Sequence, residues 1–330
     1  MEARAGEGQN YIPSAKPAAR LRLTVPGECA GLRLDQCLAR LLPEYSRSRL
    51  QSWIRAERVT VDGAPAEPKR AVWGGEQLEV LPEAYPADTA QLPEAIALTV
   101  VFEDDALLVL DKPAGLVVHP GSGNWRGTLL NALLHHAPEL AGIPRAGIVH
   151  RLDKDTSGLM VVARTLEAQV SLARQLHARS VRREYLALVH GRVARDGTVE
   201  AAVGRHPVSR TRMAVVASGR HAVTHYHAVE SLPASTLVRC RLETGRTHQI
   251  RVHMQSIDHP LVGDPVYGRR PAGGSAAARA LLAGFPRQAL HAAHLELVHP
   301  KSRVRCGWES SLPGDLRDLI AALREAGAAQ

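Results

Sequence analysis

The sequence predicts an α+β protein with a small N-terminal unit and a larger domain built on a mixed, mostly antiparallel β-sheet flanked by helices. A stretch rich in proline, alanine and acidic residues at 82–97 separates two regions that each have their own apolar pattern. Beyond residue 180, strand-like segments follow one another with few helices between them, which is typical of antiparallel sheets. The length of 330 residues is sufficient for two hydrophobic cores.

Composition limits the class of protein and the kind of partner. Hydrophobic residues make up 45% and charged residues 22%, as in ordinary globular chains. Lys and Arg exceed Asp and Glu by 41 − 33 = 8, which favours nucleic acid as partner unless the excess reflects only an arginine-rich proteome. We expect no membrane partner and a cytoplasmic location, because there is no apolar leader or spanning run. The four widely spaced cysteines are expected to be reduced.

The N-terminal region predicts a tail followed by a compact unit. Residues 1–20 lack periodicity and predict a disordered tail. The unit at 21–81 shows apolar residues at helical spacing in two successive segments, and Ser46 is placed to cap the second helix. Two strands follow, the first running into the turn at Asp62-Gly63.

The polar side of this unit carries seven cations with few acids between them. We expect a basic rim that contacts the phosphate backbone of RNA, although a solvated helix face is the simpler alternative. The rim comprises Arg33, Arg47, Arg49, Arg55, Arg58, Lys69 and Arg70.

After the predicted linker at 82–97, the larger domain at 98–330 begins with a hairpin and alternates strands with helices. Thr128 is placed to cap a helix, and a second helix follows Thr165. Its apolar residues Leu166, Val170, Ala173 and Leu176 are expected to face the core. The strands expected here are 98–102, 106–110, 159–163, 185–189, 197–202, 213–216, 222–229, 236–243, 294–298 and 304–308.

Two more helices are expected in this domain, at 248–256 and 314–326. The Gly- and Ala-rich stretch at 273–278 predicts a surface loop.

The charged loop at 150–158 is the strongest chemical signal in the chain. Two cations and two carboxylates fall between His150 and Asp155, just before an apolar strand. A surface loop whose charges pair with each other is the simpler interpretation. The alternative is a carboxylate nucleophile held ionised by neighbouring Arg151, with Asp153 favoured and Asp155 expected to cap the turn.

Other kinds of site have little support. The sequence contains no phosphate-binding or dinucleotide glycine motif, so no nucleotide cofactor is expected. The paired histidines at 225/227, 248/253 and 291/294 have no third ligand at a suitable spacing, so no metal is expected. No GxSxG motif indicates a serine hydrolase.

Five spaced motifs resemble those of the RluA/RluD-type RNA pseudouridine synthases, and the N-terminal unit resembles the S4 RNA-binding domain. The motifs are His150–Gly158, Asp111–Gly115, Arg183–Tyr185, Gly245–His253 and His259–Gly268. The S4 resemblance rests on Arg33–Asp35, Ser46–Arg49 and Val59–Gly63. Stretches such as Gly115–Gly121 resemble most closely the RluD branch, which acts on helix 69 of large-subunit ribosomal RNA.

The resemblance implies a role for each matching residue. Asp153 would attack the nucleotide, Tyr185 would stack on the uracil, and Arg251 would pair with Asp153. Arg151 would assist base flipping and occupy the vacated place, and Ile250 would form an apolar wall. Without the resemblance, Tyr185 would be read as a core strand residue and Arg251 as one more phosphate contact. We also expect the cavity to be lined by Arg246, His119 and His253.

The expected activity is isomerisation of uridine to pseudouridine in large-subunit (23S) ribosomal RNA, on the RNA or its precursor particle. The resemblance leaves open whether Asp153 attacks the ribose or the uracil, or whether a glycal forms first. The same chemistry on another ribosomal helix or on transfer RNA is one alternative. A non-catalytic S4-type ribosome-assembly factor is another.

Overall fold

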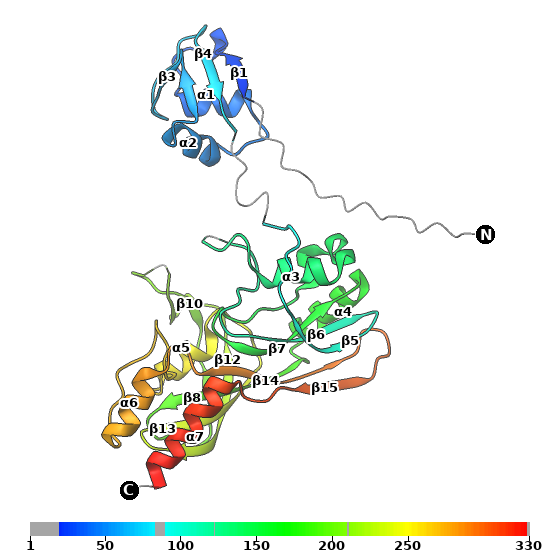
Figure 1. The fold of residues 1–330 in the computed structure, drawn as a ribbon, viewed down its shortest axis with the longest axis vertical. Helices are drawn as coiled ribbons and strands as arrows, with labels where there is room; N and C mark the ends of the chain where they lie inside the picture. The colour runs from blue at the N-terminus through cyan, green and yellow to red at the C-terminus, as the bar shows by residue number, and fades with distance from the viewer. Residues whose placement is uncertain (1–19, 83–89, 122, 210, 329–330) are drawn as a thin grey trace, which may run out of the picture. The chain divides into compact units, whose positions relative to one another are not determined.

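The computed structural model describes residues 20–82, 90–121, 123–209 and 211–328. The chain divides into two compact units, with the division between residues 88 and 89, and Figure 1 shows the elements of each. The predicted disordered tail lies outside the described residues except for Arg20, and so do residues 83–89 of the predicted linker.

The first unit is a four-stranded antiparallel sheet with two helices. Its strands lie in the order β1-β4-β2-β3. The elements are β1 (Leu21–Thr24), a 3₁₀ turn (Gly27–Cys29), α1 (Leu34–Leu41), α2 (Arg47–Arg55), β2 (Val59–Val61), β3 (Ala64–Pro65) and β4 (Gln77–Val80). The two helices and the turn after β2 confirm the sequence prediction, whereas strand β1 was not predicted.

Local sequence explains these elements. The Ser46 hydroxyl accepts a hydrogen bond from the Arg49 amide and so caps α2. Asp62 and Gly63 both have positive φ, 52° and 78°, as a tight hairpin turn requires. Leu38, Leu50 and the other apolar helix residues meet the sheet in one buried cluster.

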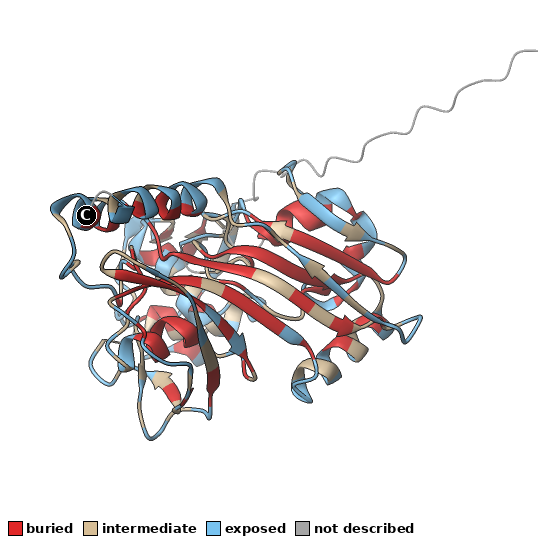
Figure 2. Ribbon diagram, turned by 90° about the horizontal axis from the view of Figure 1, so that it is seen from below, coloured by how far each residue is buried: buried red, intermediate tan, exposed pale blue. Residues whose placement is uncertain are grey.

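The second unit is built on nine strands, and Figure 2 shows that its central strands are buried. Their order is β5-β6-β7-β14-β8-β13-β12-β9, and β15 pairs with the second half of β14. Among the described strand pairings of this sheet only β14–β7 is parallel, which confirms the predicted mixed, mostly antiparallel sheet. The strands are β5 (Thr99–Glu103), β6 (Leu107–Lys112), β7 (Ser157–Ala163), β8 (Arg182–His190), β9 (Gly197–Glu200), β12 (Val223–Leu232), β13 (Ser235–Leu242), β14 (Leu290–Val298) and β15 (Arg305–Glu309).

Helices cover both faces of this sheet. On one face α3 (Leu129–His136) and α5 (Gln249–Ser256) share a core with side chains of β6, β7, β8 and β13. On the other face lie α4 (Leu166–His177), α6 (Ala276–Gly284) and α7 (Gly314–Ala328). The short strands β10 (Val203–Arg205) and β11 (Met213–Val215) form a separate hairpin. The described part of this unit also contains 3₁₀ turns at Pro138–Gly142 and Pro144–Gly147.

The predicted inward face of α4 is wrong for three of its four residues, because only Leu176 is half-buried and packs against the core. Leu166 is 52% exposed and Val170 is 48% exposed, whereas Ala168 and Leu172 are buried against the sheet. Both pairs have the i, i+4 spacing of a helix face, so spacing alone could not distinguish them. The Thr165 cap fixes the start of the helix. Packing against β7 then buries the face that carries Ala168 and Leu172.

Two other segments differ from the prediction. The stretch at 273–278 is not simply a loop, because Ser275 caps α6, which packs on α7 through Ala278 and Leu282. Consecutive alanines have the highest helix propensity, which outweighs the preceding glycines. The second half of the predicted linker runs along α3, where the Asn131 amide donates to the carbonyl oxygens of Ala90 and Leu92.

No helix within the described part of the chain is both long enough and apolar enough to cross a membrane.

Candidate active site

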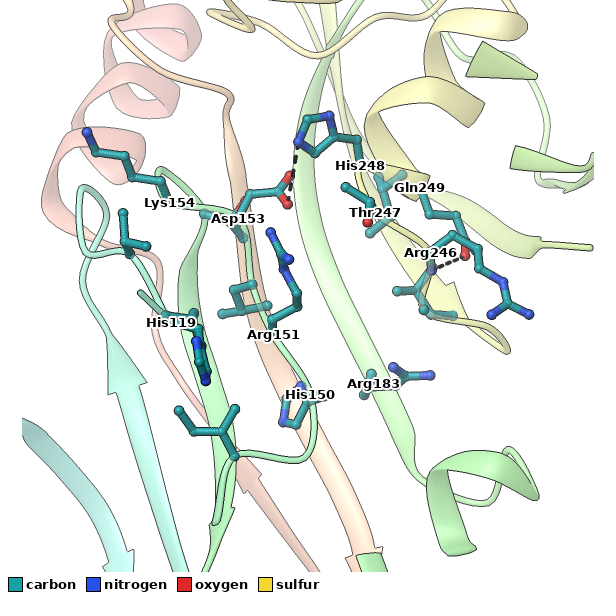
Figure 3. Close-up of a pocket in the computed structure, with 18 of the residues that line it drawn as sticks. His119, His150, Arg151, Asp153, Lys154, Arg183, Arg246, Thr247, His248 and Gln249 are labelled. Carbon is teal, nitrogen blue, oxygen red and sulfur yellow. Dashed lines mark hydrogen bonds and ion pairs between the residues drawn. The ribbon is translucent and has the colours of Figure 1, made fainter. Parts of the chain in front are cut away.

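A cavity of about 860 Å³ opens on the sheet face that α3 and α5 cover (Figure 3). Most of its walls come from four segments that are far apart in the sequence: 117–121, 145–156, the start of β8, and 242–251. Asn124, Leu176, His177 and Leu290 complete the lining. All seven residues predicted to act on the substrate line it, namely His119, Arg151, Asp153, Tyr185, Arg246, Ile250 and Arg251.

The loop that carries Asp153 is fixed mainly through its backbone. The Thr156 amide donates to the Asp153 carbonyl at 3.1 Å and closes the turn. The buried ammonium of Lys112 donates to three carbonyl oxygens, those of Pro113 (2.7 Å), Leu116 (3.0 Å) and Lys154 (2.9 Å). Lys112 therefore ties the preceding loop to the Asp153 loop.

Gly158 allows this loop to enter the sheet beside β14. Its φ is +110°, and a Cβ there would lie 2.3 Å from the Ala292 carbonyl oxygen and 2.6 Å from the Ala292 nitrogen. No side chain fits in that space. One residue earlier, the Ser157 hydroxyl and His291 Nδ1 are hydrogen-bonded at 3.0 Å, which joins β7 to β14.

Arg251 on α5 connects two carboxylates. Its Nη1 donates to Asp153 at 2.9 Å, while Nε and Nη2 donate to the two oxygens of Asp264 at 2.7 and 2.9 Å. The guanidinium and Asp264 are almost fully buried, and the Asp153 side chain is 17% exposed. Burial opposes the charge of Arg251, but the hydrogen bonds and charges of both carboxylates outweigh it and raise its pKa.

Asp264 stays ionised for the same reason. Burial favours the neutral acid, but Arg251 and the amides of Tyr267 and Val266 hold its pKa below the usual value. The Tyr267 ring lies 5.0 Å from the Arg251 guanidinium carbon, and its hydroxyl accepts from the Met213 amide. These contacts leave the guanidinium one well-defined orientation toward the cavity.

His248 lies on the other side of Asp153. Its Nε2 is 3.9 Å from Asp153 Oδ1, and its Nδ1 is hydrogen-bonded to the Tyr267 hydroxyl at 2.8 Å. Burial lowers its pKa, although the charge of Asp153 opposes this shift. Its φ of +56° places it in the left-handed region at the start of α5.

Tyr185 and Ile250 form the apolar part of the cavity wall, 6% and 4% exposed. Burial raises the pKa of Tyr185, so its hydroxyl is neutral near pH 7. The nearby His150 accepts the Val161 amide on its Nε2, and burial together with the charge of Arg183 lowers its pKa to about 3. The cavity thus combines one carboxylate, a buried aromatic ring and several cations.

Three expectations about individual residues are corrected. His253 does not line the cavity, because it is buried and bonded to the Thr224 hydroxyl and the Ala201 carbonyl. Among the described residues Arg151 does not pair with Asp153 and its side chain is exposed, whereas the expected pair of Asp153 with Arg251 is present. Among the described residues no hydrogen bond involves the carboxylate of Asp155, so it does not cap the turn; its carbonyl accepts from Arg287.

The basic rim of the first unit also needs correction. Asp35 is fully buried and accepts hydrogen bonds from Arg33, Arg47 and Gln51. The Arg49 guanidinium lies over the rings of Tyr45 and Trp53, at 4.9 and 5.0 Å. Three of the seven predicted cations therefore hold the unit together as well as facing solvent.

Sequence reasoning missed four residues of the site: Lys112, Arg183, His248 and Asp264. Each lies inside a motif that supported the family resemblance, but nothing in the sequence pairs Asp264 with Arg251 or Lys112 with the Lys154 carbonyl. Only the folded chain brings these groups together. The described residues contain no group of three His, Cys, Asp or Glu side chains placed to hold a metal ion.

Comparisons with known proteins show which family the chain is similar to. Residues 106–256 match the family model described as RNA pseudouridylate synthase, and residues 32–78 match the S4 domain. The chain is 58% identical over 328 residues to ribosomal large subunit pseudouridine synthase D of Nitrosomonas europaea, covering 96% of this chain and 94% of that protein. It is 56% identical to the protein of the same name from Pseudomonas aeruginosa, covering 91% and 95%.

Solved structures show the same relationship. The human protein RNA pseudouridylate synthase domain containing 4 is similar with a TM-score of 0.55 and 27% identity, covering 68% of this chain and 93% of that one. The human domain-containing 1 protein is similar with a TM-score of 0.52 and 25% identity, covering 70% and 96%.

Proposed function

This chain belongs to the RNA pseudouridine synthase family, and we propose that it isomerises specific uridines of large-subunit (23S) ribosomal RNA to pseudouridine. The observation that carries the proposal is the ion pair of Asp153 and Arg251 in a cavity that also exposes Tyr185 and Ile250. The shared identity extends over nearly the whole chain, including the S4 domain. The cytoplasmic location expected from the sequence remains a prediction.

The reaction breaks the bond from ribose C1′ to N1 of uracil and joins the same carbon to C5. C5 loses a proton and N1 gains one, so atoms and electrons balance without an oxidant or a second substrate. In the proposed mechanism Asp153, paired with Arg251, is the nucleophile, and Tyr185 stacks on the uracil. Whether Asp153 attacks the ribose or the ring, or a glycal forms first, stays open.

The target base has to leave its stack before it can reach Asp153. Arg151 is exposed at the mouth of the cavity, where it is free to follow the base and occupy its place in the RNA. Ile250 provides an apolar surface for the extruded uracil. We propose helix 69 as the target, in the RNA or in its precursor particle, by analogy with the RluD branch.

The experiment is pseudouridine mapping after reaction of the purified full-length protein with unmodified large-subunit ribosomal RNA. We expect modification by the wild-type protein and none by Asp153→Asn. Asp258→Asn is the matched control, since it removes an exposed carboxylate just after α5 that does not line the cavity. Turnover by a clean Asp153→Asn preparation would overturn the proposal.

The same mapping separates the alternatives. Modified uridines outside helix 69, or in transfer RNA, would keep the chemistry and change the target. A non-catalytic assembly factor predicts that Asp153→Asn supports normal subunit assembly and that the wild-type protein modifies no RNA.

A further inference from the structure

Arg183 on β8 is a buried cation without a counterion. Its side chain lines the cavity, yet the residue is only 8% exposed and its Nε is fully buried. Among the described residues, neither a hydrogen bond nor an ion pair involves its guanidinium. Buried charges are ordinarily paired, because removing an uncompensated charge from water is unfavourable. Arg183 is therefore an exception that requires a reason.

The carboxylates near Arg183 in the sequence and in the cavity already form ion pairs with other arginines. Glu184 points to the other side of β8, where Arg182 and Arg239 both donate to it. Asp153 pairs with Arg251. The cation next to Arg183 in the wall is Arg246, whose Nε donates to the His221 carbonyl, and Figure 3 shows both side chains away from Asp153.

The fold reserves space for this guanidinium. A Cβ at Gly245, in the loop between β13 and α5, would lie 2.8 Å from Arg183 Nη1. Gly245 does not have a positive φ, so its backbone conformation is open to any residue. A side chain at this position would force the Arg183 guanidinium to move from the place that it occupies beside Gly245.

The neighbouring titratable side chains His150 and Tyr185 do not supply a negative charge to balance Arg183. His150 is held neutral, because burial and Arg183 lower its pKa to about 3. Tyr185 lies two residues further along the same face of β8, about 7 Å away at the usual rise of a strand. The wall beside the aromatic ring therefore carries an uncompensated positive charge directed at the cavity.

We propose that Arg183, in the space left by Gly245, binds a backbone phosphate of the RNA next to the nucleotide whose base reaches Tyr185. This inference rests on the proposed function for the identity of the ligand, and on the buried, unpaired guanidinium for its chemistry. A phosphodiester supplies the missing negative charge and accepts two parallel hydrogen bonds from a guanidinium. Phosphate contacts of this kind fix the register of a nucleic acid without reading its sequence.

The first test requires no catalysis. Unfolding of the full-length protein is measured with inorganic phosphate and with chloride at equal ionic strength. We expect phosphate to raise the melting temperature of the wild-type protein but not of Arg183→Met. In chloride the Met variant should be at least as stable as wild type, because an unpaired buried charge is gone. Arg303→Met, on the exposed turn between β14 and β15, is the matched control.

Two results of this test would overturn the inference. One is a phosphate shift of wild-type size in Arg183→Met. The other is a clear loss of stability of that variant in chloride, which would identify Arg183 as a structural residue.

The second test locates the phosphate. RNA oligonucleotides spanning a uridine that the wild-type protein modifies carry one methylphosphonate, 5′ or 3′ of that uridine. Arg183→Met should weaken binding of unmodified RNA about 10- to 100-fold, as for the loss of a charged hydrogen bond. It should cause no further loss on the RNA whose contacted phosphate is neutral. Full additivity at both positions would contradict the inference.

Gly245→Ala provides an independent check, because it keeps the charge and fills its space. We expect it to lower RNA affinity and to reduce the phosphate shift, because the guanidinium has to move from its position, but by less than Arg183→Met does. If the wild-type protein modified no RNA, the proposed function would fail, whereas the phosphate shift would still decide the role of Arg183.

Discussion

Arg251 holds Asp264 with two parallel hydrogen bonds and therefore turns only Nη1 toward Asp153. Asp264 receives further hydrogen bonds from the amides of Val266 and Tyr267. The orientation of the Arg251 guanidinium is thus fixed by Asp264, a carboxylate that does not line the cavity. Pairing alone would leave Arg251 free to rotate about its contact with Asp153.

We expect Asp264→Asn to impair both turnover and folding. The neutral amide leaves Arg251 with Asp153 as its only ionised partner, and the guanidinium is no longer held in the same orientation. Turnover should therefore fall about 10- to 100-fold. Breaking this buried pair should lower the free energy of unfolding by about 3 to 5 kcal/mol. Single-turnover kinetics and urea unfolding measure the two effects. Asp258→Asn, an exposed carboxylate at the end of α5, should change neither.

We expect activity to fall as the pH rises through about 8, because Lys112 loses a proton there. Burial lowers the pKa of Lys112 to about 8 from 10.5, although Asp155 and Asp153 oppose the shift. The charged ammonium donates to three carbonyls, and the neutral amine has only two N–H groups. Turnover against pH measures the step, which Lys112→Met should abolish and Lys301→Met should retain.

The titration of Lys112 should not lower the stability of the protein over the pH range in which activity falls. Between pH 8 and 10.5 the unfolded chain binds more protons at Lys112 than the folded chain does. The contribution of this group to the free energy of unfolding therefore increases with pH over that window. A fall in stability in step with the fall in activity would contradict the assignment to Lys112.

Gly158→Ala should be severely destabilising. The added methyl carbon would lie 2.3 Å from the Ala292 carbonyl oxygen, and the positive φ adds backbone strain. Because the obstacle is the backbone of β14, we expect a loss of about 3 kcal/mol or more in urea unfolding. Gly142→Ala, where the same methyl meets no atom within 4 Å, should cost much less.

The cations of the S4 domain should divide into two groups. Arg47→Gln removes two hydrogen bonds from buried Asp35 and should lower the stability of that domain by about 1 to 3 kcal/mol. Arg55→Gln changes an exposed side chain and should instead reduce the salt dependence of RNA binding by about one unit of slope. Hydrogen exchange over 32–78 and binding at several salt concentrations separate the effects. Equal loss of protection in both variants would contradict this division.

Much of the fold was predictable because local signals agree with the final structure. The Ser46 and Thr128 caps begin helices, and the acidic turn before β6 joins a hairpin, as the sequence predicts. The errors occur where two local signals compete. Leu166 and Val170 have the spacing of a buried stripe, but the sheet selects Ala168 and Leu172.

The candidate site was predictable only as a set of residues. Asp153, Tyr185 and Arg251 lie on three different elements, and the family motifs identified each of them. The contacts that position these residues were not predictable, because the hydrogen bonds of Asp264 and Lys112 depend on tertiary structure. Arg183 illustrates this most clearly, since only the folded chain reveals that a cation is buried without a partner.

The parallel pairing of β14 with β7 has a consequence for the order in which the protein matures. It joins His291 to Ser157, and Arg287 reaches back to the carbonyl of Asp155, so the loop that carries Asp153 is closed by residues that are synthesised about 130 positions later. A nascent chain that ends before β14 carries Asp153, Tyr185 and Arg251 but lacks the strand that shapes their loop. Contacts this distant in sequence form late in folding. We therefore expect the Asp153 loop to reach its final shape only after β14 has been synthesised.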